Sequence, residues 1–287
     1  MGDRRPSVAG MFYPANKAAC RRELAEYLGG VEPSGIKEPI LGGVVPHAGW
    51  AFSGSTAAFV YAAIGAQETP ETVVLFGAVH RWGVPTASMY GQGRWRTPLG
   101  DLSIDEELAE AVTQQSAGLV KDRPEAHADE HSIEVQLPFI KYVFPDAHIL
   151  PIAMPPLDTA PEVGRAVAQA ARKLGRKAPA LASSDLTHYG PRYGFAPAGV
   201  GEQALEWTKA NDKRLLDCAI EMHPLEVLEE ASAHHNACGA GAIAATMAYA
   251  AELGATRGVV LHHTTSYDVM PTGRPSDMVG YAAVIFV

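Results

Sequence analysis

Short, uninterrupted apolar runs recur along the chain and are separated by segments with helical spacing. Such runs are typical of strands that are buried on both faces, whereas apolar residues three and four positions apart indicate one face of a helix. The runs predict strands at residues 40–45, 72–77, 85–90, 148–153, 179–183, 257–266 and 278–287. The helical spacing predicts helices at residues 18–28, 55–64, 105–115, 161–174, 201–220, 224–233 and 242–253. Because strands and helices alternate, the pattern favours βαβ units with parallel strands.

Three stretches do not fit this alternation. Residues 1–15 contain prolines and are expected to lie extended across the body of the protein, and residues 94–102 are interpreted as a loop. Residues 132–144 have helical spacing but include Pro138, which predicts a kink or a break into two pieces. No internal repeat divides the chain. We therefore predict one α/β domain over residues 1–287, with a central, mostly parallel or mixed sheet flanked by helices.

The composition is that of a globular protein, since 47% of the 287 residues are apolar and 19% are charged. The formal net charge is −9, and no basic block occurs, so nucleic acid and anionic membrane surfaces are not expected as partners. Three cysteines without a CxxC spacing favour a reducing compartment. The first residues lack the apolar region of a signal peptide, and no apolar run reaches about 18 residues. A cytoplasmic location is therefore expected.

Two histidines follow predicted buried strands. His47 comes after the run at residues 40–45 with one residue between them, and His80 follows the run at residues 72–77. If these strands are parallel neighbours, both side chains emerge at one edge of the sheet, where α/β proteins place their functional groups. Cys238 precedes a predicted helix, whose N-terminus favours a thiolate, and two imidazoles with a thiolate can hold a transition-metal ion. The alternative is two structural histidines and a small buried cysteine, because the histidine spacing is no metal signature.

An aspartate and a histidine follow the strand predicted at residues 179–183. In the segment SSDLTHYG, Asp185 and His188 are three positions apart. A carboxylate that accepts a hydrogen bond from an imidazole fixes its tautomer and raises its basicity, so His188 is a candidate acid–base residue. The alternative is that Ser184 and Asp185 cap a helix.

The segment HADEH matches the H-x-x-E-H pattern of a class of zinc peptidases. That pattern requires His127 and His131 on one face of the same helix, with Glu130 as the general base. The helical spacing begins only near Ser132, which leaves His127 pointing elsewhere. A zinc peptidase that uses His127 and His131 is kept as an alternative function. The other interpretation is that Glu130, His131 and Glu134 are polar groups on a helix end that borders a pocket.

Several longer motifs are spread, in order, over nearly the whole chain. They are RPSVAGMFYPA, GGVVPHAGWAFSGSTAA, LFGAVH, EHSIEVQLPF, SSDLTHYG, HNACGAGAIAA, TSYDV and VGYAAVIF. In these motifs the chain resembles the Memo family, whose bacterial and archaeal members are known as the B component of the AmmeMemoRadiSam system.

The resemblance implies a fold similar to that of the class III extradiol ring-cleavage dioxygenases, which are non-haem iron enzymes. It implies that the metal ligands are His47, His80 and Cys238, and that the polar residues of the pocket are Asp185 and His188. The dioxygenases have a carboxylate where this chain has Cys238. Because a thiolate is softer, the substitution moves the preference of the site towards copper or zinc, with iron as the third candidate.

Around this site, Trp50, His131 and Tyr189 are expected to line the pocket for a small-molecule or peptide ligand. The family context implies partner proteins of the radical-SAM or AMMECR type. Two classes of function follow. The first is a metal-dependent oxidoreductase, similar to a dioxygenase, in which His188 is oriented by Asp185 and transfers a proton. The second is a non-catalytic metal- or peptide-binding adaptor that keeps the pocket, which the missing carboxylate ligand favours.

Overall fold

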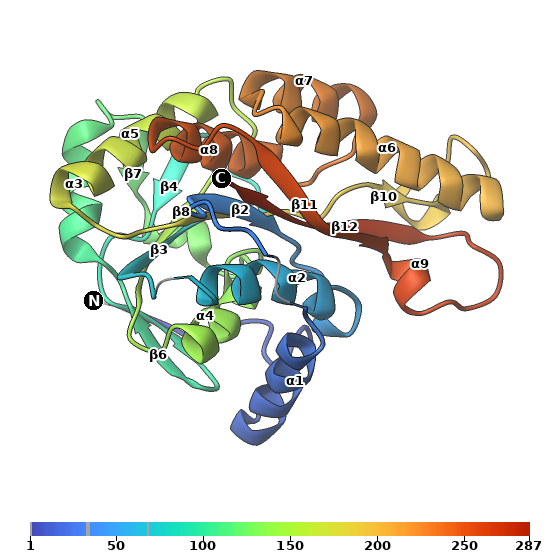
Figure 1. The fold of residues 1–287 in the computed structure, drawn as a ribbon, viewed down its shortest axis with the longest axis horizontal. Coiled ribbons are helices and arrows are strands. Elements are labelled where there is room, and N and C mark those ends of the chain that lie inside the picture. The colour runs from blue at the N-terminus through green and yellow to red at the C-terminus, as the bar shows by residue number, and fades with distance from the viewer. Residues whose placement is uncertain (1, 33–34, 68) are drawn as a thin grey trace.

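A mixed β-sheet crosses the middle of the molecule, and helices cover both of its faces (Figure 1). The computed structural model describes residues 2–32, 35–67 and 69–287. Over these residues the strand order is β10-β12-β2-β9-β3-β8-β4-β7, and β11 pairs with β12. The strands of this sheet are β2 (Gly42–Val45), β3 (Thr72–Gly77), β4 (Ala87–Met89), β7 (Val120–Asp122), β8 (His148–Ala153), β9 (Ala180–Ser183), β10 (His188–Tyr189), β11 (Gly258–Thr265) and β12 (Met278–Phe286).

The middle of the sheet is parallel. β2 pairs with β9, β9 with β3, and β3 with β8, all in parallel registers. These four strands are predicted apolar runs, and all of their residues are buried except the first residue of β8. β12 pairs with β2 and β4 pairs with β8 in antiparallel registers, so the sheet is mixed. The prediction of one α/β domain with a mixed sheet flanked by helices is confirmed.

Successive residues of the central strands face two separate hydrophobic cores, because strand side chains alternate between the faces of a sheet. Val44 packs in a core with α3 (Glu106–Gln115), α5 (Ala160–Leu174), α6 (Glu202–Ile220), α7 (Pro224–His234) and α8 (Ala240–Glu252). Val45 packs in the other core with α1 (Lys17–Gly29), α2 (Trp50–Gly65) and α4 (Leu137–Val143). Two buried faces explain why the strand sequences contain no polar alternation.

Helix α2 begins at Trp50, earlier than the helical spacing predicts. Gly49 lies outside the helix, at its N-cap, whereas Gly54 lies within it. A Cβ at Gly54 would lie 2.6 Å from the ring of Tyr27. Gly54 therefore allows α1 to pack closely on α2, and it does not end an element.

The interpretation of residues 94–102 as a loop is wrong. The segment belongs to a small sheet with the strands β1 (Asp3–Arg4), β5 (Arg94–Thr97) and β6 (Gly100–Ser103). Trp95 pairs with Leu102 across the β5–β6 hairpin, and both side chains are buried while the arginines that flank Trp95 are exposed. This alternation of buried and exposed residues is that of a strand, but it is too short to stand out in the sequence.

The segment at residues 132–144 is divided into two pieces at Pro138, as predicted. The 3-10 turn η2 (Glu134–Gln136) precedes α4, whose first turn contains Pro138. The remaining short elements are η1 (Pro124–His127), η3 (Pro191–Tyr193) and α9 (Ser266–Val269). Within the part of the chain that the structure describes, no helix is both long and apolar enough to cross a membrane.

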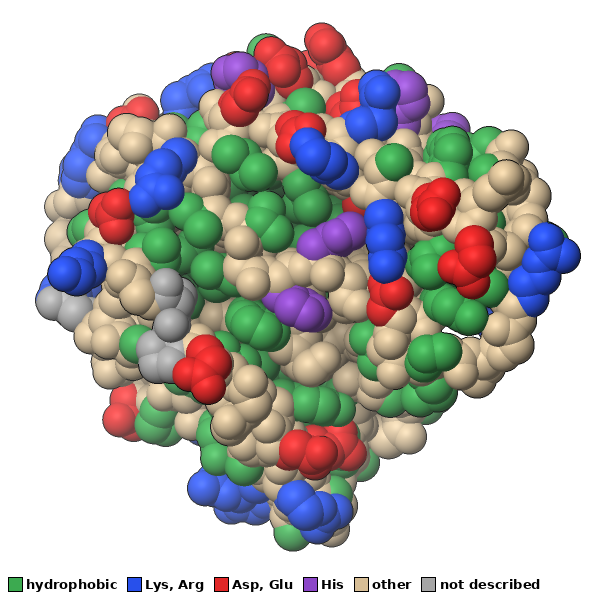
Figure 2. Space-filling model, turned by 45° about the vertical axis from the view of Figure 1, so that its right-hand side comes forward, with side chains coloured by type: hydrophobic (Ala, Val, Ile, Leu, Met, Phe, Trp, Pro, Cys, Tyr) green, Lys and Arg blue, Asp and Glu red, His purple; other side chains and the backbone are tan. Residues whose placement is uncertain are grey.

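Acidic and basic side chains are mixed on the face that Figure 2 shows. Hydrophobic and histidine side chains lie together near the centre of this face. The acidic side chains that contribute to the net charge of −9 are therefore not gathered into one patch on this side of the molecule.

Candidate metal centre

Three segments with polar side chains leave the sheet at the same edge. His47 follows β2, Asp185 follows β9, and His80 comes shortly after β3. Because β9 lies between β2 and β3 and all three run parallel, their carboxyl ends meet. The predicted convergence of His47 and His80 is confirmed, since their ring centroids are 5.1 Å apart. The two strands are separated by β9, however, and are not direct neighbours.

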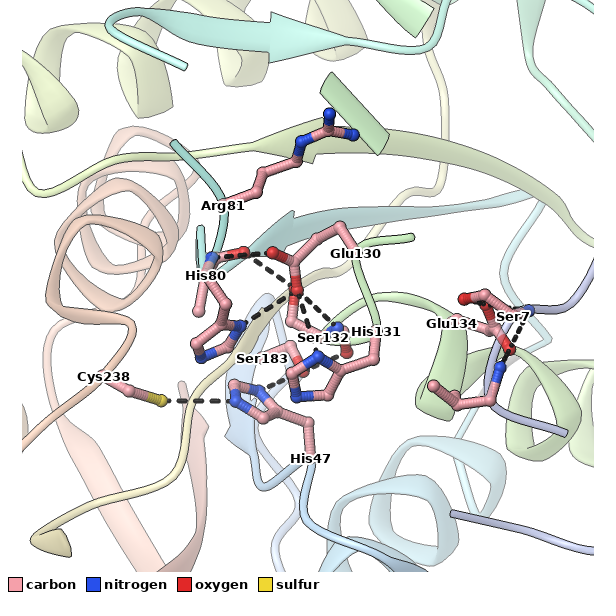
Figure 3. Close-up of polar contacts among 12 residues, drawn as sticks. Ser7, His47, His80, Arg81, Glu130, His131, Ser132, Glu134, Ser183 and Cys238 are labelled. Carbon is pink, nitrogen blue, oxygen red and sulfur yellow. Dashed lines mark hydrogen bonds and ion pairs between the residues drawn. The ribbon is translucent and has the colours of Figure 1, made fainter. Parts of the chain in front are cut away.

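A third histidine completes a cluster. The ring of His131 lies 5.3 Å from that of His47 and 4.6 Å from that of His80. One ring nitrogen from each of the three residues lies within 4.8 Å of the others, so they could hold one metal ion. Figure 3 shows the three rings close together, while Arg81 points away from them. The sequence pattern indicates only a pocket-lining role for His131, and its place in the cluster comes from the structure.

Gly77 makes the close approach of His131 possible. A Cβ at Gly77 would lie 2.5 Å from Ile133 and 2.8 Å from the hydroxyl of Ser132. That hydroxyl donates a hydrogen bond of 2.8 Å to the carbonyl of Ala78, which ties the loop to the end of β3. A side chain at position 77 would therefore push the loop, and His131 with it, away from the sheet edge.

Glu130 orients His80. One carboxylate oxygen accepts from the backbone N–H of His80 at 2.7 Å, and the other lies 3.0 Å from its Nδ1. The second oxygen also accepts from the N–H of Ser132 at 3.0 Å, and Glu130 is only 3% exposed. A buried carboxylate beside Nδ1 holds the ring proton there. Nε2 of His80 is therefore the nitrogen that would bind a metal ion after losing its proton, as in most metal-bound histidines.

A hydroxyl orients His47. Nδ1 of His47 lies 3.1 Å from Oγ of Ser183. The Ser183 hydroxyl donates to the carbonyl of Ser132 at 2.6 Å and accepts from the amide of Gln136 at 2.9 Å. It has one proton, already donated, so it can only accept from His47. His47 therefore carries its proton on Nδ1, and its Nε2 is free.

Cys238 lies at that free nitrogen. Its Sγ is 3.3 Å from Nε2 of His47 and accepts a hydrogen bond of 3.3 Å from the N–H of Asp185. A Cβ at Gly239 would lie 2.9 Å from the carbonyl of Ser183, so this glycine lets the start of α8 approach β9. Zinc–ligand bonds of about 2.0 Å to nitrogen and 2.3 Å to sulfur place two such donors about 3.5 Å apart. The observed separation fits donors that share an ion.

The ionisation of these groups is coupled. Burial raises the pKa of Cys238, but the neighbouring rings of His47 and His80 lower it to about 5. Burial lowers the pKa of His80, whereas Cys238 and Glu130 raise it to about 10. Burial and the charges of His47 and His80 lower the pKa of His131 to about 4. The imidazoles thus favour the thiolate of Cys238, in addition to the helix N-terminus that the sequence indicates.

Asp185 connects His47 with His188. Its Oδ1 accepts from the backbone N–H groups of His47 at 2.7 Å and Ala48 at 3.2 Å, and its Oδ2 lies 3.9 Å from Nε2 of His188. Burial raises the pKa of Asp185, but His47 and His188 outweigh this effect and lower it to about 2. Because His188 begins the strand β10, Ser184 and Asp185 cap no helix, and that alternative is wrong.

Trp50 and Tyr189 lie in the apolar interior. The indole N–H of Trp50 donates to the carbonyl of Val135 at 3.2 Å, and the hydroxyl of Tyr189 donates to the carbonyl of Gly199 at 3.0 Å. Their exposed fractions are 2% and 0%. A ligand-lining role for these two residues stays a prediction. The side chain of His188, by contrast, is 36% exposed.

His127 lies in different surroundings from the cluster. It is completely buried, its Nε2 lies 2.9 Å from the carbonyl of Ser88, and its ring packs against Tyr90 and Trp95. Burial lowers its pKa to about 3. Because His127 faces this aromatic pocket while His131 faces the cluster, the structure does not support the zinc-peptidase alternative.

Glu134 holds the N-terminal segment in place. The fully buried carboxylate accepts hydrogen bonds from Arg4, Ser7, Val8 and Tyr13. Figure 3 shows the contact with Ser7. Within the same segment, the ring of Phe12 packs 4.9 Å from that of His131. Residues 2–15 run across the body as expected, but the expectation that they form no element of their own is wrong, because Asp3–Arg4 form the strand β1. The segment forms one wall beside the cluster.

The donors fit a transition metal better than a hard cation. Among the described residues, the donor group within 4.8 Å consists of three imidazole nitrogens, and it contains His131 in place of the predicted ligand Cys238. The sulfur of Cys238 lies beside this group, 3.3 Å from Nε2 of His47, whereas Glu130 and Asp185 contact the histidines at other atoms. Nitrogen and sulfur donors favour zinc, copper and iron, while magnesium and calcium require mostly oxygen.

The comparison with known proteins agrees with the motifs. A family model described as Memo-like protein matches residues 4–285. A MEMO1 family protein of Pyrococcus abyssi is 37% identical over 292 residues, which cover 98% of each chain. A MEMO1 family protein of Methanopyrus kandleri is 37% identical and covers 99% of each chain, and one of Methanococcoides burtonii is 39% identical over 98% of this chain and 99% of its own. The chain therefore belongs to the Memo-like family.

Proposed function

We propose that this chain is a metal-dependent oxidoreductase, related to the class III extradiol dioxygenases. The donors for one ion would be His47, His80, Cys238 and His131. The observation that carries the proposal is the convergence of the three ring nitrogens within 4.8 Å of one another. The sulfur of Cys238 is added as a fourth donor because it lies 3.3 Å from Nε2 of His47. The thiolate favours copper or zinc, and a redox reaction favours iron or copper.

The place of the cluster also supports the proposal. It lies at the carboxyl edge of parallel strands, where open α/β sheets bind their ligands. When bound there, the ion would supply a Lewis acid that orients a chelating substrate and takes part in electron transfer. The exposed parts of His80 and His131, 32% and 23% of their side chains, leave an approach from solvent.

His188 is the proton-transfer residue of this proposal. Burial lowers its pKa, but Asp185 and Cys238 raise it above the ordinary value. The charge of Asp185, whose Oδ2 lies 3.9 Å from Nε2 of His188, favours the ring proton at Nε2, so Nδ1 would accept a proton from a substrate hydroxyl. The ring stacks on Tyr193 with centroids 5.2 Å apart, and this contact fixes its plane.

The experiment measures metal content and oxygen uptake separately. We expect anaerobically purified protein to carry the ion and to consume oxygen with a catechol-type chelating substrate. The variant His188→Ala keeps the ion and loses about 100-fold or more in turnover, the usual contribution of a general acid–base residue. The exposed His223, which pairs with Glu226, provides the matched control, and His223→Ala leaves both readouts unchanged. Wild-type turnover in His188→Ala contradicts this role.

A non-catalytic binding protein is the second candidate. It is favoured because no carboxylate joins the metal-donor group identified among the described residues, whereas the dioxygenases have one. Such a protein would bind the ion and a small-molecule or peptide ligand without turnover. Saturable oxygen uptake by metal-loaded protein, lost in His47→Ala, decides against it.

A further inference from the structure

A cavity opens beside Cys238. Its volume is about 870 Å³, which is the size of pockets that hold small organic ligands. The walls come from the loop after β8, the first turn of α5, one side of α7 and the start of α8. Cys238 is therefore part of the wall of this cavity as well as a neighbour of His47.

Part of the cavity surface is apolar. Leu228, Ala231 and Ala240 are buried beneath it. Leu225, in the first turn of α7, is 53% exposed at its wall. An exposed leucine in a concave site offers apolar contact to a ligand, because burying it removes hydrocarbon from water.

The charged residues of the wall are all acidic. Asp158, Glu162 and Glu229 line the cavity, and no lysine or arginine does so among the described residues. Glu162 pairs with Arg165 at 3.0 Å. Asp158 and Glu229 form no ion pair within the described part of the chain, so both carboxylates are available to a ligand.

Helix α8 begins at the cavity. Its N-terminus carries about half a unit of positive charge, which alone would favour an anion. The three carboxylates carry more charge of the opposite sign. Asp158 and Glu162 also lie at the start of α5, where acidic residues offset the dipole of that helix. The net electrostatic preference of the cavity is therefore for a cation.

We propose that this cavity binds an organic cation with an apolar body, such as a protonated amine or a guanidinium group on a hydrocarbon chain or ring. The apolar body packs on Leu225 and Leu228, and the cationic group lies by Asp158 and Glu229. The occupant lies next to Cys238, and its proposed role is that of a substrate for the adjoining centre. That role as substrate rests on the proposed function, whereas the binding itself does not.

The first test compares three probes that share a phenyl ring on a four-carbon chain and have cationic, neutral and anionic head groups: 4-phenylbutylammonium, 4-phenylbutanol and 4-phenylbutyrate. Calorimetric titration of the full chain should give the tightest binding for the ammonium compound and the weakest for the carboxylate. Asp158→Asn and Glu229→Gln each weaken ammonium binding by about 2- to 5-fold, the range for an exposed ion pair, and leave alcohol binding unchanged. Glu226→Gln, on the same helix but outside the cavity wall, is the matched control.

The second readout locates the probe. The thiolate of Cys238 attacks a methanethiosulfonate reagent, forms a mixed disulfide and releases methanesulfinate. Bound 4-phenylbutylammonium should slow this modification at Cys238, while Cys218 on α6, which is not part of the cavity wall, reacts at its usual rate in the same sample. Mass spectrometry of the peptides separates the two sites.

Equal affinity for the ammonium and carboxylate probes overturns the proposal, as does ammonium binding that is unchanged in both Asp158→Asn and Glu229→Gln. Metal content, measured on the same preparations, separates this failure from a failure of the proposed function. Metal-free protein that still selects the cation leaves the cavity proposal standing and removes only the substrate role. Metal-loaded protein that shows no preference for the cationic probe contradicts the cavity proposal and leaves the proposed function standing.

Discussion

The sulfur of Cys238 lies 3.3 Å from Nε2 of His47, although 191 positions separate the two residues in the chain. The contact joins the start of α8 to the end of β2. Asp185, at the end of β9, links both partners, because its N–H donates to the sulfur and its carboxylate accepts from the N–H of His47. The candidate centre is thus assembled where loops from distant parts of the chain meet at one edge of the sheet.

The first prediction concerns His131. If its ring is a metal donor, His131→Ala weakens metal binding by at least about 10-fold, because an ion loses one of its bonds. His127→Ala leaves the affinity unchanged, since His127 faces Ser88 and the aromatic pocket. Titration of both variants with zinc and a competing chelator measures the difference. A larger loss in His127→Ala than in His131→Ala reverses the assignment.

The second prediction concerns the carboxylate that orients His80. Glu130→Gln keeps the size of the side chain but removes the charge beside Nδ1, so the ring becomes a weaker donor. We expect metal affinity to fall by about 10- to 100-fold with little change in the far-ultraviolet circular dichroism. Glu125→Gln, at an exposed neighbouring position, is the control. Unchanged affinity in Glu130→Gln means that the carboxylate has no role in the centre.

The third prediction concerns the close approach at Gly77. Gly77→Ala places a Cβ 2.5 Å from Ile133, and overpacking of this kind lowers the free energy of unfolding by about 1–3 kcal/mol. The displaced loop carries His131, so metal affinity should fall as well. Gly29→Ala in α1 is the control, because a Cβ there meets nothing within 4 Å. Urea unfolding of both variants gives the comparison, and equal stability of the two contradicts the packing argument.

The fourth prediction concerns pH and His127. The pKa of His127 is about 3 in the folded protein against an ordinary value of 6.5, so the unfolded chain binds an additional proton between these values. Stability is therefore lost as the pH falls below 6.5, and the loss at pH 5.5 is about 1.4 kcal/mol. His127→Gln should show a correspondingly smaller difference in unfolding free energy between pH 7.5 and pH 5.5. An identical difference in wild type and variant contradicts the burial argument.

The central strands and the meeting of His47 with His80 can be predicted from the sequence. Residues 72–77 are apolar at every position but the two ends because the strand is buried on both faces, and a parallel sheet brings its carboxyl ends together. The position of Cys238 just before a helix can also be predicted from the sequence. Local pattern was sufficient here because burial and helix spacing act within a few residues.

The role of His131 could not be predicted in the same way. Its loop has no periodicity, and its place depends on the missing side chain of Gly77 and on the buried Glu130. The hairpin around Trp95 cannot be predicted for a related reason, since its alternation of buried and exposed residues spans only a few residues and includes exposed arginines. Both features depend on contacts between segments that are far apart in the chain.

The central claim is that the four donors hold one ion. Its most direct test is the metal content of anaerobically purified protein, measured by mass spectrometry for wild type, His47→Ala and Cys238→Ser. We expect about one transition-metal ion per chain in the wild type, none in His47→Ala and a reduced amount in Cys238→Ser. Wild-type protein that carries no ion, and takes up none from iron, copper or zinc solutions, contradicts the claim.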